Sequence, residues 1–136
     1  SGYVIHPGPT VGYRIKGENA VFAYIPDHEP ALGLTGLLHD TKWLSGINLV
    51  SNADLLMHDA QYTTQEYSAR LGWGHSSIED AIQYASLSGV KRLLLTHHDP
   101  SHTDVLLDEI FSAIKEKVKQ PFIFELAREG MEIELP

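Results

Sequence analysis

Histidine and aspartate are the residue types most able to do chemistry in this 136-residue chain, which contains eight histidines and no cysteine. Disulfides, Cys-ligated zinc and thiol nucleophiles are therefore excluded. The polar residues that border predicted strands or helices are His6, Asp27, His58, Asp59, His75, His97 and His98. In α/β sheets, ligands gather at the carboxyl ends of strands. Imidazole nitrogens and carboxylate oxygens converging there would suit a divalent metal such as Zn, Mn or Fe.

The elements that must position these residues alternate between strands and helices. Apolar runs and alternation predict strands over residues 11–15, 20–25, 54–58, 92–96, 122–124 and 131–134. A stripe at helical spacing predicts a helix over 106–118, and residues 63–71 suit a shorter one. The pair Ser76 and Glu79 is typical of a capping box that starts a helix ending near Gly89. This alternation predicts an α/β layered fold.

Each polar residue also has a simpler structural interpretation. A single histidine at a strand end more often caps a turn or faces solvent than binds a metal. This interpretation suits His28, His39 and His102 best. Asp59 could accept backbone N–H groups in a turn, and the two serines before the helix suffice as caps, so no serine nucleophile is proposed. It is the collective pattern that indicates a metal or acid–base site.

The composition is that of a globular protein, with 43% hydrophobic and 21% charged residues. The longest apolar runs are too short for a membrane span, and no signal-peptide pattern is visible, so we expect a cytoplasmic protein with no membrane partner. The formal net charge is −8. A surface that acidic disfavours non-specific binding to nucleic acid or anionic lipid.

Five motifs follow one another in a recognisable order. They are His6-Pro-Gly-x-x-x-Gly12-Tyr13-Arg14, Tyr24-Ile25-Pro26-Asp27-x-Glu29-Pro30, Leu56-Met57-His58-Asp59-Ala60-Gln61-Tyr62, Gly74-His75-Ser76-Ser77 and Leu95-Thr96-His97-His98. Together they resemble the C-terminal half of a metallo-β-lactamase superfamily hydrolase, in the branch of ribonuclease Z and cyclic phosphodiesterases. The resemblance covers residues 3 to about 104.

The resemblance implies a role for each site residue. His6 and His97 would be metal ligands, and Asp27 would bridge two divalent ions, with zinc preferred over manganese or iron. His75 would donate a proton or stabilise charge at the scissile phosphate, and Asp59 would orient it. His98 is a second candidate ligand, should the alignment shift by one residue. The family's His-x-His-x-Asp-His cluster, which supplies most of the ligands, does not occur in this chain.

The resemblance also implies an architecture. Residues 1–136 would form the C-terminal half of a four-layer αββα sandwich, as one mixed sheet with helices on a single face. The other face of the sheet would be exposed and apolar. We therefore expect it to pair with a missing N-terminal half or with a second copy of the chain across a symmetric interface.

The implied activity is phosphodiester hydrolysis by a metal-activated hydroxide, absent from this chain alone because most ligands are missing. Only 21 positions separate His6 from Asp27, which leaves no room for the long tRNA-binding arm of ribonuclease Z. With the acidic charge, this favours a small phosphoester substrate and makes nucleic acid an unlikely partner. β-Lactams fit less well, and lactone or other ester hydrolysis stays open. The alternative is a non-catalytic sensory or interaction module that retains half of the fold.

Overall fold

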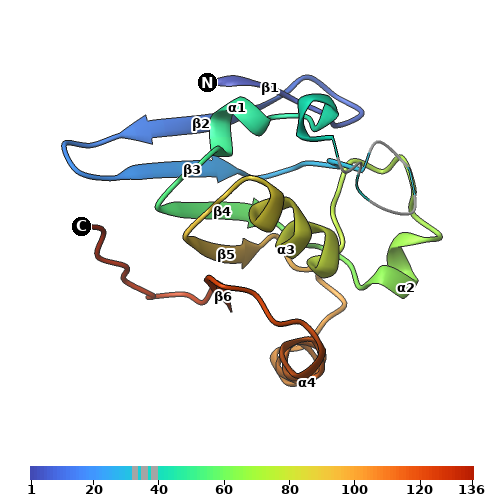
Figure 1. Ribbon diagram of the computed structural model, residues 1–136. Helices are drawn as coiled ribbons and strands as arrows, with labels where there is room; N and C mark the ends of the chain where they lie inside the picture. The colour runs from blue at the N-terminus through green and yellow to red at the C-terminus, as the bar shows by residue number, and fades with distance from the viewer. Residues whose placement is uncertain (32–33, 35–36, 38–39) are drawn as a thin grey trace.

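The computed structural model describes residues 1–31, 34, 37 and 40–136, so His39 lies outside the described residues. Its centre is one mixed sheet whose strands lie in chain order (Figure 1). The strands are β1 (Gly2–Val4), β2 (Thr10–Lys16), β3 (Val21–Ile25), β4 (Leu55–Asp59), β5 (Arg92–Thr96) and β6 (Ile123–Leu126). The first three pair antiparallel, and β3 to β6 pair parallel. The carboxyl ends of β3, β4 and β5 therefore meet at one edge of the sheet.

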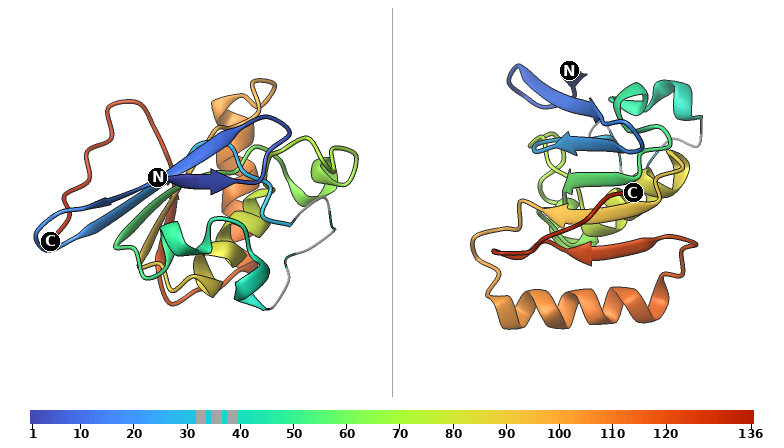
Figure 2. Two further views of the ribbon diagram at one scale, coloured as in Figure 1. Left: turned by 90° about the horizontal axis from the view of Figure 1, so that it is seen from above. Right: turned by 90° about the vertical axis from the view of Figure 1, so that its left-hand side faces the viewer.

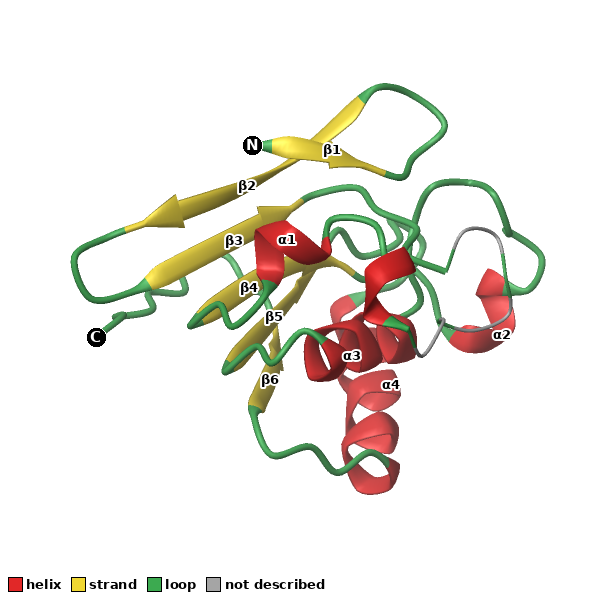
Figure 3. Ribbon diagram, turned by 45° about the horizontal axis from the view of Figure 1, so that its top comes forward, coloured by secondary structure: helices red, strands yellow, loops and turns green. Residues whose placement is uncertain are grey.

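The helices cover one face of this sheet. They are η1 (Thr41–Trp43), α1 (Ile47–Val50), α2 (Thr64–Tyr67), α3 (Ile78–Leu87) and α4 (Asp104–Lys117). Figure 3 shows α1, α3 and α4 on the same side of the strands. Strand residues Leu56, Leu93 and Leu95 are completely buried on that face, in one cluster with the inward side of α3. This burial is the main stabilising contribution, because apolar area removed from water drives folding. No helix among the described residues combines the length and apolarity that crossing a bilayer requires.

The opposite face of the sheet is also apolar, and it is much less covered at β2 than at β4 and β5. The strand register aligns Tyr13, Tyr24, Met57 and Leu94 in a row across that face. Tyr13 and Ile15 remain 44% and 56% exposed. Figure 2 shows the C-terminal segment running along this side of the sheet. The predicted α/β fold, a mixed sheet with helices on a single face, is confirmed.

Most of the predicted elements are present, and the exceptions have physical reasons. Strands at 11–15, 20–25, 54–58 and 92–96 and the helix over 106–118 correspond to β2 to β5 and α4. The predicted strand at 131–134 is wrong: these residues are not in a strand, although Gly130 does turn the chain with φ +74°. The predicted capping box is also wrong. Ser77 caps α3 by accepting from the Asp80 N–H, while the Ser76 hydroxyl donates to the carbonyl of His28.

Candidate metal and acid–base site

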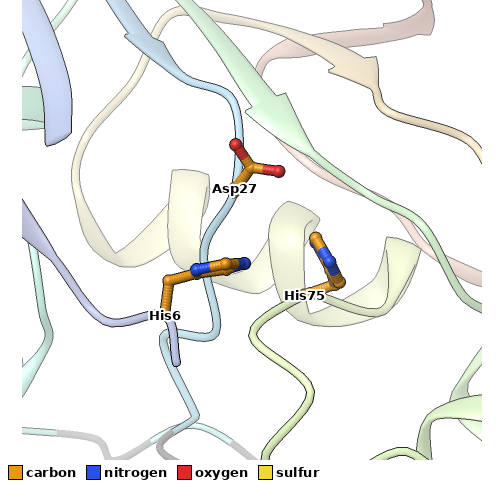
Figure 4. A group of neighbouring side chains, drawn as sticks. All are labelled: His6, Asp27 and His75. Carbon is orange, nitrogen blue, oxygen red and sulfur yellow. The ribbon is translucent and has the colours of Figure 1, made fainter. Parts of the chain in front are cut away.

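Five predicted site residues come together at the carboxyl ends of β3, β4 and β5. His6 lies in the loop between β1 and β2, Asp27 follows β3 and Asp59 ends β4. His75 precedes α3, and His97 directly follows β5. Figure 4 shows His6, Asp27 and His75 from three separate segments gathered around one point. The parallel strands bring these segments together, since equivalent strand ends lie side by side.

His75 is at the centre of the group. One ligand atom from each of His6, Asp27 and His75 lies within 4.8 Å of the other two. Asp59, His75 and His97 form a second such group. The ring centroid of His75 is 5.4 Å from that of His6 and 4.8 Å from that of His97. The two groups therefore form one continuous site that shares His75.

Asp59 is a fully buried carboxylate that contacts two of these histidines. Its Oδ2 accepts a hydrogen bond from His75 Nδ1 at 2.8 Å and one from the His28 backbone N–H at 3.0 Å. Burial raises the pKa of Asp59, but His75, His97 and the His28 N–H outweigh it and hold that pKa below its ordinary value. Because His75 donates from Nδ1, its Nε2 is left for a ligand or substrate.

His97 has an unusual backbone that brings its side chain to this site. Its φ of +57° is in the left-handed region, which residues other than glycine rarely adopt and which often marks functional sites. His97 Nδ1 lies 3.4 Å from Asp27 Oδ1 and 3.7 Å from Asp59 Oδ1. The adjacent Asp59 carboxylate raises the pKa of His97. His98 instead lines a cleft with Asp104, Asp108 and Arg128, so the structure brings His97 and not His98 to Asp27.

Two buried histidines lie behind the site, and the sequence did not indicate their arrangement. His28 and His58 are both fully buried, with His28 Nδ1 2.9 Å from His58 Nε2. His58 Nδ1 lies 2.6 Å from the Asp59 carbonyl and donates to it. His58 Nε2 must then accept from His28 Nδ1–H, and both rings are neutral. Burial lowers the pKa of each histidine, in His28 together with the nearby His58. The interpretation of His28 as a surface loop residue is therefore wrong.

The residues present fit a divalent cation. Imidazole and carboxylate donors this close to one another are a ligand set that suits divalent ions such as zinc, manganese or iron. Asp59 Oδ1 is buried and has no hydrogen-bond partner among the residues that the structure describes. A buried carboxylate oxygen is costly to leave unpaired, so a cation near it would complete the site. Two sets of side chains could hold an ion: His6 with Asp27 and His75, and Asp59 with His75 and His97.

Comparisons with known proteins identify the family. A family model described as a beta-lactamase superfamily domain matches residues 2–98. Ribonuclease Z of Trichodesmium erythraeum is 33% identical over 121 residues, covering 78% of this chain and 37% of that protein. Ribonuclease Z of Gemmatimonas aurantiaca is 30% identical over 136 residues, covering 98% of this chain and 37% of that protein. The chain thus spans little more than a third of these relatives, consistent with part of a larger domain.

Solved structures share the fold. The short form of human tRNase Z matches with a TM-score of 0.65 and 23% identity, over 98% of this chain and 41% of that one. The metallo-beta-lactamase fold protein YhfI of Bacillus subtilis matches with a TM-score of 0.64 and 22% identity, over 95% of this chain and 46% of that one.

These relatives correct the prediction about partners. The ribonuclease Z relatives and human tRNase Z act on RNA by name, so the expectation of a small phosphoester substrate with nucleic acid unlikely is wrong. The net charge of −8 was a poor guide to the substrate because it is a sum over a chain that spans only part of such proteins. A summed charge does not determine the local electrostatic potential where a phosphate binds. Because the family model matches residues 2–98, the chain belongs to the beta-lactamase superfamily.

Proposed function

We propose that this chain carries the acid–base half of a metal-dependent phosphodiesterase that cleaves RNA. The observation that carries the proposal is His75, whose Nδ1 donates to the buried Asp59 while the ring lies between His6 and His97. A histidine fixed in one tautomer beside a set of metal-ligand side chains is an arrangement suited to proton transfer at a phosphate ester.

The proposed roles follow from the family resemblance together with the donor atoms that the site brings close. His6, Asp27 and His97 would hold a divalent ion, most simply zinc. When bound, the ion supplies Lewis acidity toward a phosphoryl oxygen and lowers the pKa of water. Asp59 holds His75 with Nε2 directed away from the carboxylate. For this step the ring must carry a second proton on Nε2: as the P–O bond to the leaving group breaks, this imidazolium gives its Nε2 proton to the departing oxygen and is left as the neutral Nδ1–H tautomer held by Asp59.

RNA is the proposed substrate class because the curated relatives are named as ribonucleases. One surface feature of this chain supports it. Trp73 stands 60% exposed, two residues before His75. An exposed indole next to a phosphate-cleaving site offers a face on which a base can stack, whatever its sequence.

The domain organisation is also a proposal. Residues 1–136 would be the C-terminal half of the sandwich, and the remaining ligands would come from chain outside these residues. The partial coverage of the relatives supports this arrangement. We therefore expect the chain by itself to bind metal weakly and to show no turnover, because one His/Asp/His set leaves much of the coordination to water.

The test is metal analysis and phosphodiester hydrolysis in the full-length protein that contains this chain. Asp27→Ala should lose metal, whereas His75→Ala should retain the metal and reduce kcat by at least 100-fold. Bis(p-nitrophenyl) phosphate and a short RNA serve as substrates. Metal-free, inactive full-length protein would contradict the proposal and favour a non-catalytic sensory or interaction module.

A further inference from the structure

Glu29 is a buried carboxylate to which neither the fold nor the proposed chemistry has given a role. It lies two positions after Asp27 and is only 2% exposed. Its backbone N–H donates to the carbonyl of Ile5 at 3.0 Å. Ile5 immediately precedes His6, so the main chain of Glu29 ties the Asp27 segment to the His6 segment.

The side chain of Glu29 reaches a third site segment. Its Oε2 accepts a hydrogen bond from the Gly74 N–H at 2.9 Å. Its Oε1 accepts from the Gly72 N–H at 2.7 Å and from the Tyr67 hydroxyl at 2.9 Å. Gly74 immediately precedes His75. One residue therefore joins the three segments that carry His6, Asp27 and His75.

The segments joined by Glu29 are in direct contact. Gly74 has a φ of +94°, and a Cβ atom placed on it would overlap the side chains of His6 and Pro7. Only glycine fits so close an approach with that backbone. The distance between His6 and His75 is consequently set by how the loop before His75 sits on the β1–β2 loop, and the Glu29 carboxylate fixes that position.

The donors explain why a carboxylate occupies this place. A buried carboxylate is costly unless hydrogen bonds satisfy it, and here two backbone N–H groups and a hydroxyl do so. Charge-assisted bonds of this kind are about twice as strong as neutral ones. The loop from residue 70 to residue 74 has no strand or helix to hold it. Its order depends instead on these bonds.

We propose that Glu29 is a positioning residue that sets the geometry between His6 and His75 by holding the Gly72–Gly74 backbone. It touches no reacting atom. It acts through the main chain of the residue next to each histidine. The effect on turnover rests on the proposed function, because it assumes that His75 transfers a proton. The effect of Glu29 on the geometry of His75 is independent of the proposed function.

The test is Glu29→Gln in the full-length protein. A carboxamide has nearly the same shape, but its NH₂ must face either the Gly72 N–H or the Gly74 N–H, leaving one donor unsatisfied. We expect faster amide hydrogen exchange at Gly72 and Gly74 and a broadened His75 Nδ1–H signal in ¹⁵N NMR. kcat should fall roughly 10- to 100-fold with little change in KM, the usual range for residues that orient a site.

Asp54→Asn is the matched control. Asp54 also accepts a backbone N–H, from Val21, and a side-chain donor, Lys91, but it lies at the opposite ends of the strands. It should lower stability without changing the His75 signal or kcat. Equal effects of the two variants on the His75 signal and kcat would overturn the proposal, because Glu29 would then be a general stabilising residue.

A measurement on the unaltered protein covers the case in which Glu29→Gln fails to fold. The amides of Gly72 and Gly74 should exchange as slowly as buried strand amides, and Tyr67→Phe should leave them slow, because both backbone bonds remain. Rapid exchange at the two glycines in the unaltered protein would refute the proposal. A protein with slow exchange but no hydrolysis would contradict the proposed function and leave the role of Glu29 supported.

Discussion

At the scale of single residues, Asp59 determines which nitrogen of His75 is available. Its Oδ2 holds the His75 Nδ1 proton, and the same oxygen accepts the His28 N–H. Asp59→Asn keeps the shape but can turn an NH₂ toward Nδ1, which would favour the wrong tautomer. We expect kcat to fall by roughly 10- to 100-fold with bound metal unchanged, as for other residues that orient a site. A parallel loss of metal would show that Asp59 is itself a ligand.

Trp73 allows a second prediction at this scale, with Trp43 as its control. The two tryptophans are 60% and 70% exposed, but only Trp73 is close in sequence to His75. Trp73→Ala should weaken RNA binding by about 1–3 kcal/mol, the range for loss of one stacked base. Hydrolysis of bis(p-nitrophenyl) phosphate, which presents no base, should change little. If Trp43→Ala weakens RNA binding equally, stacking beside His75 is not the cause.

The candidate site shows what one sequence can and cannot indicate about residues. His6, Asp27, Asp59, His75 and His97 could be grouped because each borders a strand or helix at one edge of the sheet. Their convergence then follows from parallel pairing. The sequence could not predict the buried positions of Glu29, His28 and His58, because the burial of a polar side chain depends on segments distant in sequence. The one available signal was three consecutive ionisable residues, 27–29, enclosed by two prolines.

At the scale of secondary structure, the ends of β3 and β4 make stability depend on pH. Burial holds the pKa values of His28 and His58 below 6.5, and burial does the same for His98. The unfolded chain therefore takes up these protons before the folded one. Below about pH 6.5 the free energy of unfolding should fall by up to about 1.4 kcal/mol per pH unit for each histidine. Between the unfolded and the folded pKa values, stability thus rises with pH.

Urea denaturation between pH 7.5 and pH 5 measures this slope. The raised pKa of His97 acts in the opposite direction, but only above pH 6.5, where the unfolded chain has already lost that proton. His28→Asn places an amide N–H where Nδ1 now donates to His58 and removes one titrating group. For this variant, the slope of the free energy of unfolding against pH below pH 6.5 should be smaller by about 1.4 kcal/mol per pH unit. An unchanged slope would mean that His28 does not titrate differently in the two states.

Elements with a continuous apolar pattern could be predicted well, and elements that depend on a partner could not. The runs 54–58 and 92–96 are buried on both sides, so hydrophobicity alone identifies them as β4 and β5. Residues 131–134 alternate as a strand should, yet no described strand pairs with them. Periodicity specifies two faces but supplies no neighbour, and an unpaired segment with that pattern remains irregular.

At the scale of the whole molecule, the sheet face opposite the helices should be the contact with the rest of the protein. It carries exposed Tyr13 and Ile15 beside the partly covered Tyr24 and Met57. Ile15→Lys should lower the free energy of unfolding of the full-length protein by about 1–3 kcal/mol, because a charge would be buried there. In the chain alone, the same substitution should change the free energy of unfolding by no more than about 0.5 kcal/mol.

Val105→Lys is the control for that prediction, since Val105 is 69% exposed on the helix side. It should be neutral in the chain alone and in the full-length protein, because the outer surface of the helix layer faces solvent in a sandwich. If Ile15→Lys is also neutral in full-length protein, the exposed sheet face is not an internal contact and residues 1–136 do not form half of a sandwich.

The strand order has a consequence for the kinetics of folding. Each strand pairs only with its neighbours in chain order, but the parallel pairs join residues far apart in the sequence, such as Ile25 with His58 and Leu56 with Leu93. Closing loops of that length costs entropy before the strands pair, so the parallel part of the sheet should form more slowly than the antiparallel part. As the chain leaves the ribosome, β1 to β3 can assemble first as an antiparallel meander, and each later strand meets an edge that is already formed. Glu29 follows the last strand of that meander and cannot bind the Gly72 and Gly74 N–H groups until those residues have been synthesised. The loop before His75 should therefore become ordered late, after β1 to β3 have paired.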